Sequence, residues 1–341
     1  MAKKIAIVLF NLGAPDSLEV VKPFLFNLFN DRHIIDLPGP LRYILAKFIS
    51  NVRAKNSRKI YEELGGSSPL LELTRLQAEA LEGELNEQQD KEYKVFISMN
   101  YWRPFADEAA ALVKEYSPES IVLLPLYPQF STTTTLSSIA GWRRHAKDLG
   151  VEEKIVCCYP VAEKFIAAHV ELILPIYNEA KSRGAPRVLF SAHGLPQKIV
   201  DGGDPYAWQV ERTVKQIIKK LAIDNLDWAI CYQSKVGPLK WLTPSTEEEI
   251  KRAGQDGVQV VLVPVAFVSE HSETLVELDV EYKMFAESHN VPGYFRVPAL
   301  GVNKSFIKAL AMLCRNDNAI MEFCPHKKCL GRQLKTTKKC I

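Results

Sequence analysis

The sequence predicts an α/β protein built of two similar halves, each with a parallel sheet. An apolar stretch at residues 7–10 runs into a glycine and a proline a few residues later, and the stretch at residues 187–190 does the same in the second half. A second pair, residues 121–128 and 260–267, places a proline inside an apolar strand and follows it with hydroxyl or acidic residues. Strands and helices alternate at a spacing typical of right-handed parallel crossovers. Open sheets of this kind bind ligands beyond the carboxyl ends of their strands, so we expect the functional site in a cleft there.

Each element of the first half follows from a local pattern. After the first strand, apolar residues at a helical period predict a helix that Asp16 or Ser17 can cap. The glycine- and serine-rich segment at residues 65–69 has two interpretations: it turns the chain and caps the next helix, or it offers amides and hydroxyls to an anion. The remaining pattern predicts helices at residues 70–85 and 105–116 and strands at residues 93–100 and 121–127.

The second half repeats this alternation and sets the expected domain limits. Its pattern predicts helices near residues 165–182, 206–221 and 246–253, strands at residues 188–191, 228–232 and 258–267, and helical character at residues 274–284. We therefore expect an N-terminal lobe over residues 1–155, a C-terminal lobe over residues 156–315 that carries the metal site, and a basic, cysteine-containing tail over residues 316–341.

Composition limits the class of protein. With 341 residues, 47% of them hydrophobic and 24% charged, the chain is long enough for two globular lobes and is not mainly disordered. A net charge of only +3 gives no field that favours nucleic acid as a partner. Apolar runs fall short of the roughly 20 residues that span a bilayer, and the amino terminus lacks the pattern of a signal peptide. The cytoplasm is the expected location.

The cysteines and the end of the chain raise separate questions. Seven cysteines, an odd number, do not suit the disulfide framework of a secreted protein, so free thiols or metal ligands are expected. From Cys324 to the end the chain has lysines and arginines but no acidic residue. Such a tail either meets an anionic surface or is simply solvated.

Bulky apolar residues gather between about residues 20 and 55 and have two interpretations. They form buried core, or they form a hydrophobic lip over an apolar ligand or a membrane surface. Core is the ordinary interpretation of such residues, and the second interpretation rests on flanking basic residues such as Arg42, Lys47 and Arg53. Peripheral contact with a membrane is therefore one expectation for this segment.

Two histidines stand at predicted strand exits, and an acidic row begins beside one of them. His193 follows one strand and His271 another, while Glu273, Glu277 and Glu281 recur every four residues and line one flank of a helix. The row is either a solvated acidic face or a path for cations or protons. A neutral imidazole is both a metal ligand and a base with a pKa near 6.5. Two imidazoles and a carboxylate suit Fe(II), Zn or Co, and a hydrolase can use the same groups.

Other signals point away from hydrolysis. The chain contains no G-x-S-x-G elbow, no H-E-x-x-H helix and no P-loop. Aromatic residues instead mark the strand exits, where they either pack in the core or form the wall for a flat aromatic ligand. These residues are Tyr61, Tyr101, Trp102, Tyr127, Tyr232 and Trp241.

Seven motifs, taken together and in order, resemble those of the ferrochelatase family, which inserts Fe(II) into a porphyrin. Any one motif is weakly specific, whereas seven in the same order from Leu9 to Asp279 are strong evidence. They lie at residues 9–15, 65–69, 127–131, 191–196, 203–206, 232–242 and 269–279.

The resemblance implies the fold and the reaction. The expected fold is chelatase-like: two Rossmann-like lobes, each a parallel four-stranded sheet flanked by helices, around a porphyrin cleft. The expected activity is that of a lyase-class enzyme that inserts Fe(II) into protoporphyrin IX and releases two protons, the last step of haem biosynthesis. Coproporphyrin as substrate, another tetrapyrrole chelatase of the same fold, and a tetrapyrrole carrier without catalysis are the alternatives. Porphyrin and ferrous iron are the implied partners, and the sequence sets no oligomeric state.

The resemblance also implies roles for particular residues. It marks His193 and Glu273 as the catalytic pair that binds the Fe(II) substrate. It places His271, Glu277 and Glu281 on a proton or metal path, on a helix that contains a π-type bulge. Residues that match ring-contacting, cleft or propionate positions are Tyr61, Tyr101, Trp241, Arg53 and Ser68.

Some ferrochelatases carry a [2Fe–2S] cluster, and the tail raises that expectation here. Three tail cysteines, Cys324, Cys329 and Cys340, resemble cluster ligands, and a fourth thiolate is required. The internal cysteine of the animal enzymes is replaced by Thr132, so Cys157 or Cys158 would have to substitute. The alternative is a loose basic tail with unrelated thiols.

Overall fold

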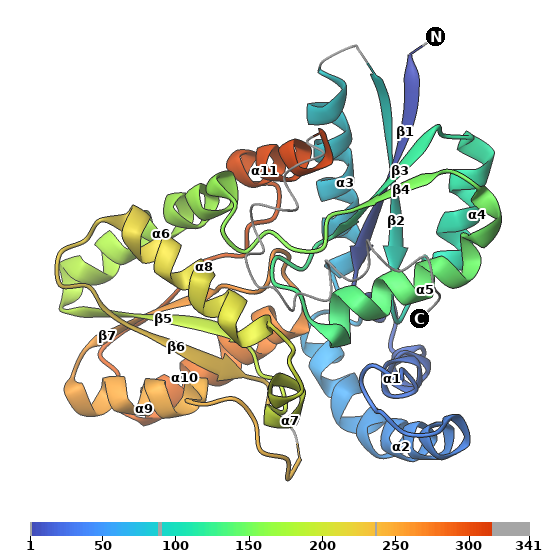
Figure 1. Cartoon of the computed structure of the whole chain (residues 1–341). Helices are drawn as coiled ribbons and strands as arrows, with labels where there is room; N and C mark the ends of the chain where they lie inside the picture. The colour runs from blue at the N-terminus through green and yellow to red at the C-terminus, as the bar shows by residue number, and fades with distance from the viewer. Residues whose placement is uncertain (1, 88–90, 236, 316–341) are drawn as a thin grey trace. The chain divides into compact units, whose positions relative to one another are not determined.

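The computed structural model describes residues 2–87, 91–235 and 237–315 and divides the chain into two compact units. Unit 1 contains Met1–Tyr159 and Leu310–Ile341, and unit 2 contains Pro160–Ala309. Each unit holds one sheet of four parallel strands flanked by helices, as the sequence predicts (Figure 1).

The sheet of unit 1 has the strand order β2–β1–β3–β4. Its strands are β1 (Lys3–Asn11), β2 (Lys91–Met99), β3 (Ser120–Pro125) and β4 (Glu152–Ile155). The helices of unit 1 are α1 (Val21–Phe29), α2 (Gly39–Glu63), α3 (Leu70–Asn86), α4 (Ala106–Tyr116), α5 (Ser137–His145), the π-helix η1 (Thr132–Leu136) and the 3₁₀-helix η2 (Lys147–Leu149). The central strand β1 is buried on both faces over its last seven residues, as expected for a parallel sheet covered by helices.

The sheet of unit 2 has the order β6–β5–β7–β8 and repeats this topology. Its strands are β5 (Pro186–His193), β6 (Asp227–Gln233), β7 (Gln259–Pro264) and β8 (Tyr294–Arg296). Its helices are α6 (Glu163–Arg183), α7 (Gln197–Asp201), α8 (Tyr206–Leu221), α9 (Thr246–Asp256), the π-helix η3 (Glu273–Glu281) and α10 (Tyr282–Ser288). Helices α6 and α8 cover one face of the sheet, and α9 and α10 cover the other (Figure 1).

Local sequence explains where two of these helices form. In α8, Val210, Val214 and Ile217 are buried along one stripe at helical spacing, so this face packs on the sheet. In α9, the Ser245 side chain accepts from the backbone N–H of Glu248 (3.2 Å), and the Glu248 carboxylate accepts from the backbone N–H of Ser245 (2.7 Å). This capping box fixes the start of α9.

The last described helix, α11 (Lys304–Arg315), crosses the division between the units. From Leu310 on it belongs to unit 1, whereas the sequence placed all residues up to 315 in the second lobe. Lys154 Nζ donates to the carbonyl of Cys314 (3.1 Å), and Arg315 Nη2 donates to the carbonyl of Leu85 (3.0 Å). These contacts attach the end of α11 to β4 and α3.

The apolar segment between residues 20 and 55 divides into a buried part and an exposed part. Val21 and Phe24 of α1 are buried in a cluster with Tyr61. On α2, Ala46 and Ala54 are buried, whereas Ile44 and Phe48 are 66% and 65% exposed, so the core interpretation is wrong for these two bulky side chains. Helix α1 begins later than predicted. It starts at Val21 without a side-chain cap, so neither Asp16 nor Ser17 caps it.

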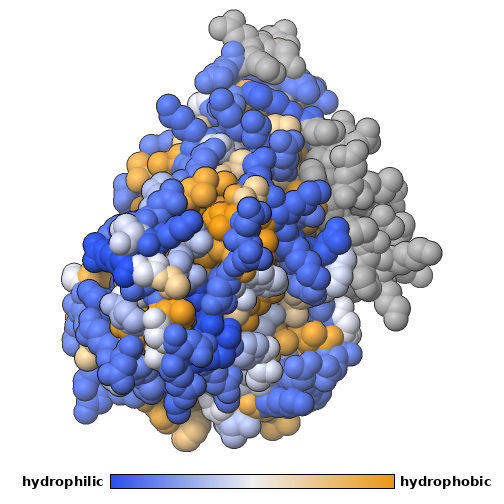
Figure 2. Space-filling model, turned by 90° about the vertical axis from the view of Figure 1, so that its left-hand side faces the viewer, coloured by the Kyte–Doolittle hydropathy of each residue, from blue (hydrophilic) through white to orange (hydrophobic). Residues whose placement is uncertain are grey.

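The surface elsewhere is mixed. On the face drawn in Figure 2, hydrophilic residues predominate around small groups of hydrophobic ones. Among the described residues, no helix combines the length and apolar character needed to cross a membrane.

Candidate active site

The carboxyl edge of the second sheet positions the histidine that the sequence singled out. His193 is the last residue of β5, and it pairs in register with Gln233, the last residue of the neighbouring strand β6. Gly194 then lets the chain turn in a crowded place: a Cβ there would lie 2.9 Å from the carbonyl oxygen of Gln233 and 3.3 Å from Trp241 Cε3. Parallel strands therefore bring His193 and Gln233 to one edge, where such sheets bind ligands.

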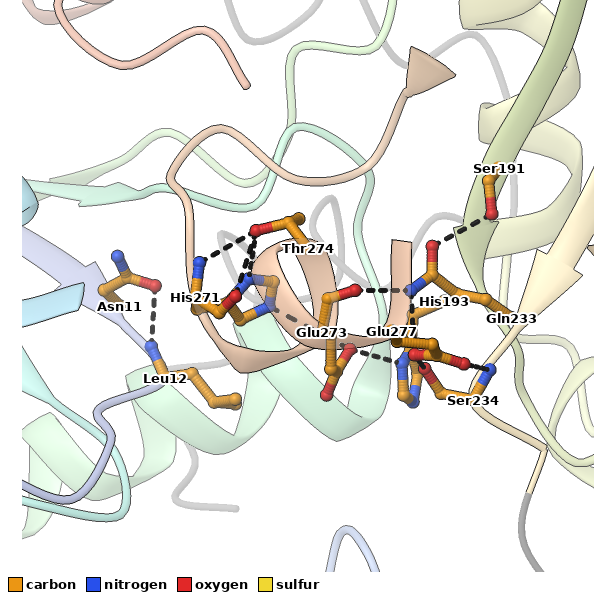
Figure 3. A network of polar contacts seen from close by, with 10 residues as sticks. All are labelled: Asn11, Leu12, Ser191, His193, Gln233, Ser234, His271, Glu273, Thr274 and Glu277. Carbon is orange, nitrogen blue, oxygen red and sulfur yellow. Dashed lines mark hydrogen bonds and ion pairs between the residues drawn. The ribbon is translucent and has the colours of Figure 1, made fainter. Parts of the chain in front are cut away.

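The acidic row lies on the π-helix η3, which follows β7 and a short loop. This confirms the π-type geometry that the family resemblance implied for this segment. π-Helical turns are rare and occur frequently at functional sites. Here the turn carries Glu273 and Glu277 toward the end of β5 and β6 (Figure 3).

His193 and Glu273 form a direct pair. The distance from His193 Nδ1 to Glu273 Oε2 is 2.9 Å, and the two side chains keep 37% and 30% of their surface exposed. Burial disfavours a charged imidazole, but the charge of Glu273 and its hydrogen bond outweigh burial, so the pKa of His193 is raised. Burial acts against the Glu273 carboxylate as well, yet the facing His193 holds the pKa of Glu273 well below its usual range. The pair thus stabilises an imidazolium beside a carboxylate.

Glu277 is held by four hydrogen bonds from three residues. Ser234 donates through its backbone N–H (2.8 Å) and its hydroxyl (2.6 Å), Gln233 through Nε2 (3.0 Å) and Tyr282 through its hydroxyl (2.9 Å). Burial and then the charge of Glu273 raise the pKa of Glu277 in spite of these donors. Glu277 therefore takes up a proton more readily than Glu273 does.

Gln233 connects the two carboxylate residues. Its Nε2 also donates to the backbone carbonyl of Glu273 (3.2 Å), and its Oε1 accepts from the hydroxyl of Ser191 (2.9 Å). The amide is thereby fixed by β5 on one side and by η3 on the other (Figure 3). Sequence reasoning missed Gln233, Ser234 and Tyr282 as site residues, although the position of Gln233 at a strand exit was a usable signal.

The other members of the predicted path differ in their surroundings. His271 is buried, its Nε2 lies 3.9 Å from Glu273 Oε2, and its Nδ1 lies 3.4 Å from the hydroxyl of Thr274. Burial lowers the pKa of His271, so this imidazole stays neutral more readily than His193. Glu281, at the end of η3, is exposed. The structure thus brings His271, Glu273 and Glu277 near His193 and leaves Glu281 at the surface.

Comparison with known proteins identifies the family. A model of the ferrochelatase family matches residues 4–318. A ferrochelatase from Wolbachia sp. subsp. Drosophila simulans is 59% identical over 92% of this chain and 99% of its own length. Those of Rickettsia bellii and Pelagibacter ubique are 54% and 52% identical, covering 91% and 92% of this chain and 86% and 92% of their own lengths.

This chain belongs to the ferrochelatase family. Among solved structures, SirB from Bacillus subtilis with Fe3+ has the same fold at a TM-score of 0.55, although it is only 13% identical. The match covers 94% of this chain and 98% of SirB. The predicted chelatase-like fold is thereby confirmed.

The family resemblance implies five residues that contact the porphyrin or line its cleft. One of them, Trp241, lies in unit 2. It forms an isolated bridge with Pro196 and borders Gly194, so it stands next to His193 in the chain's local structure. Its role toward a porphyrin stays a prediction.

The remaining four lie in unit 1 of this ferrochelatase-family chain. Tyr61 and Tyr101 are buried in one apolar cluster, and the Tyr101 hydroxyl donates to Asp31 Oδ2 (2.8 Å). Arg53 stacks over the ring of Phe29 at 5.7 Å. The backbone N–H of Ser68 donates to the carbonyl of Pro15 (2.9 Å), in the loop that sequence analysis interpreted as a turn or an anion site.

That loop has the conformation of a turn. Gly65 and Gly66 have φ values of +83° and +100°, which favour glycine. Ser68 Oγ also accepts from the backbone N–H of Leu70 at the start of α3 (3.3 Å). These contacts agree with the turn interpretation.

Of the cysteines considered as cluster ligands, the structure describes Cys157 and Cys158. Cys157 and Cys158 are 2% and 1% exposed in the core of unit 1, with their sulfurs 3.6 Å apart. Within the described residues, no group of three or more histidine, cysteine or acidic side chains is arranged to hold a metal ion. Cys324, Cys329 and Cys340 lie outside the described residues.

Proposed function

We propose that this chain is a ferrochelatase that inserts Fe(II) into protoporphyrin IX to give protohaem, with the release of two protons. In this role it is a lyase and acts at the last step of haem biosynthesis. The observation that supports the proposal most directly is the pairing of His193 with Glu273 at the carboxyl edge of a parallel sheet, beside the hydrogen-bonded Glu277. Membership of the family supplies the reaction class.

The chemistry of the substrate explains why such a site is needed. A free porphyrin carries two pyrrole N–H groups, and its nitrogen lone pairs point into the ring, so a metal ion must approach from outside a buckled macrocycle. A site that binds the buckled ring more tightly than the flat ring lowers the barrier, at a strain of about 1 to 5 kcal/mol. The enzyme must then take up the pyrrole protons.

His193 is the residue suited to accept those protons. Its side chain is more than one-third exposed, so a ligand can reach the ring, while its Nδ1 is occupied by Glu273. A hydrogen-bonded carboxylate orients the imidazole and stabilises the imidazolium that forms. A base whose pKa lies near the working pH transfers protons efficiently.

Glu277 is suited to take the proton onward. The pKa of Glu273 is lowered and that of Glu277 is raised, so a proton that leaves the His193–Glu273 pair is held more readily at Glu277. Gln233 contacts both residues and keeps the second carboxylate beside the first. The Fe(II) substrate is then met by His193 and Glu273, as the family resemblance implies.

A turnover assay tests the proposal against its alternatives. The purified chain is incubated with Fe(II) or Zn(II) and with protoporphyrin or coproporphyrin, and insertion is followed by the change in the visible absorbance bands. We expect insertion of both metals and a higher kcat/KM for protoporphyrin. A higher kcat/KM for coproporphyrin would mean that coproporphyrin is the substrate. Tight porphyrin binding without insertion would indicate a carrier.

We also propose peripheral membrane contact through the exposed apolar face of α2, with the protein otherwise in the cytoplasm. The residues of this face are Leu41 (58% exposed), Ile44 (66%), Phe48 (65%) and Val52 (62%). Their spacing places them on one stripe of the helix. An exposed apolar stripe flanked by basic side chains is the pattern of a surface that binds at a lipid interface.

A [2Fe–2S] cluster on the tail cysteines remains a proposal based on sequence resemblance. Cys324, Cys329 and Cys340 would supply three thiolates, and Cys157 or Cys158 the fourth. A red-brown purified protein whose visible absorbance is lost in Cys329→Ser would support it. A colourless protein with iron supplied during expression would rule the cluster out.

A further inference from the structure

The π-helix η3 has a second set of contacts, on the side of strand β8. Tyr294 and Arg296 are two residues apart on β8, so their side chains lie on the same face of the sheet. The Tyr294 hydroxyl donates to the backbone carbonyl of Leu278 (2.6 Å), in the middle of η3. The adjacent residue of η3, Asp279, is bound by Arg296.

Arg296 makes a bidentate contact with Asp279. Its Nε and Nη2 donate to the two carboxylate oxygens at 2.6 and 2.7 Å. Its Nη1 donates to Glu270 Oε1 (2.6 Å), and that same oxygen accepts from the backbone N–H of Ala299 (2.8 Å). The Arg296 side chain is 14% exposed, so water competes little for these contacts.

These contacts hold both ends of the segment that carries the site. Glu270 directly precedes His271, and Asp279 comes two residues after Glu277. One guanidinium thus connects the chain before the site to the chain after it. The other flank of η3 faces Gln233 and Ser234, which bind Glu277. A π-helical turn is rarely adopted, and this one is fixed from two sides.

We propose that Arg296 is a positioning residue that, with Tyr294, fixes η3 in its π-helical register and so aims Glu273 and Glu277 at the end of β5. Without these anchors the segment relaxes toward ordinary α-helical winding, which turns successive side chains through a different angle. Glu273 then no longer meets His193 in the same geometry. The inference rests on the proposed function only for its effect on catalysis.

The chain offers a matched control for Arg296. Arg187 is also buried, with 7% of its side chain exposed, and is also bound by two carboxylates: Asp227 at 2.9 Å and Asp256 at 2.9 Å. It lies six residues before His193 on β5, about 20 Å away along the strand. Arg187→Met and Arg296→Met remove the same group from comparable surroundings.

The experiment compares these two variants in iron insertion and in hydrogen exchange. We expect Arg296→Met to lower kcat at least tenfold with the porphyrin KM changed less than twofold, and to speed amide exchange within residues 273–281. Arg187→Met should leave kcat within twofold of the starting protein and exchange in that segment unchanged. Equal kcat values for the two folded variants, or unchanged exchange in Arg296→Met, would overturn the inference.

A second pair of variants, with smaller changes, tests the inference if Arg296→Met does not fold. Tyr294→Phe removes one hydrogen bond to η3, and Tyr116→Phe removes a hydroxyl that binds the carbonyl of Glu92 in unit 1 (3.1 Å). A two- to fivefold loss of kcat and faster exchange of residues 273–281 in Tyr294→Phe alone support the inference, and identical behaviour of the pair refutes it. If the starting protein inserts no metal, the proposed function fails, while the exchange measurements still test the positioning role.

Discussion

At the scale of single residues, the site depends on how neighbours change the protonation of His193 and Glu273. Each of the two residues gains its chemistry from the partner 2.9 Å away. His193 could be identified from the sequence because a histidine at a strand exit is unusual. Ser234, which supplies two of the hydrogen bonds to Glu277, could not, because a serine in a loop carries no such signal.

Replacing Glu273 should move the pH dependence of activity. In Glu273→Gln the charge that raises the pKa of His193 is gone, while burial, which lowers that pKa, remains. His193 must be neutral to accept a proton, so the acid limb of the kcat/KM profile should shift to lower pH, with kcat reduced about 10- to 100-fold. Activity of the variant is measured between pH 5 and pH 9. If the acid limb does not move in the variant, the acid limb does not report the titration of His193.

Gly194 should tolerate no side chain. An alanine Cβ there would lie 2.9 Å from the carbonyl oxygen of Gln233, so we expect Gly194→Ala to lower the free energy of unfolding by about 1 to 3 kcal/mol. Gly83→Ala is the control, since nothing lies within 4 Å of its Cβ position on α3, and it should stabilise by about 0.5 to 1 kcal/mol. Urea unfolding measures both. Equal effects of the two substitutions would contradict the packing described at the end of β5.

At the scale of elements, periodicity was informative for long segments and poor for short ones. Helix α8 has the predicted bounds, residues 206–221, because its apolar stripe is regular. Strand β8 has three residues and escaped prediction, although Tyr294 and Arg296 on it anchor the π-helix. Helix α2 was ambiguous because bulky apolar residues suit both a core and an exposed surface. Only the three-dimensional packing shows that Ile44 and Phe48 are exposed.

The exposed face of α2 should bind lipid. The double substitution Ile44→Ser and Phe48→Ser removes two apolar side chains, each of which contributes about 1.5 to 3 kcal/mol when buried, so the vesicle partition coefficient should fall at least tenfold. Met312→Ser, at another exposed apolar position, serves as the control. Flotation with phosphatidylcholine–phosphatidylglycerol vesicles measures the effect. If the starting protein does not float with the vesicles, α2 is not a membrane contact.

At the scale of the whole molecule, the fold was predictable because two halves repeat one pattern. The paired apolar segments around Pro125 and Pro264 indicate the repeat, although each strand ends at its proline and does not continue past it as predicted. The division of α11 between the units was not predictable, because it depends on side chains such as Lys154 that contact the end of that helix. The porphyrin cleft between the halves stays a prediction.

The proposed catalytic network, however, lies within one unit. His193, Glu273, Glu277 and Gln233 all belong to unit 2, so their contacts come from the packing of a single sheet and its helices. Unit 1 carries the other predicted porphyrin contacts, among them Tyr61 and Tyr101. Substitutions of these four residues should therefore affect the rate of metal insertion, and substitutions of Tyr61 or Tyr101 should affect porphyrin affinity.

The most direct test is the effect of His193→Ala on two quantities measured side by side: the rate of Fe(II) insertion into protoporphyrin, and the porphyrin Kd from fluorescence quenching. If His193 accepts the pyrrole protons, the rate of insertion should fall about 10²- to 10⁴-fold while the Kd changes less than about threefold. Insertion at an undiminished rate in a folded His193→Ala protein would show that another group removes the protons.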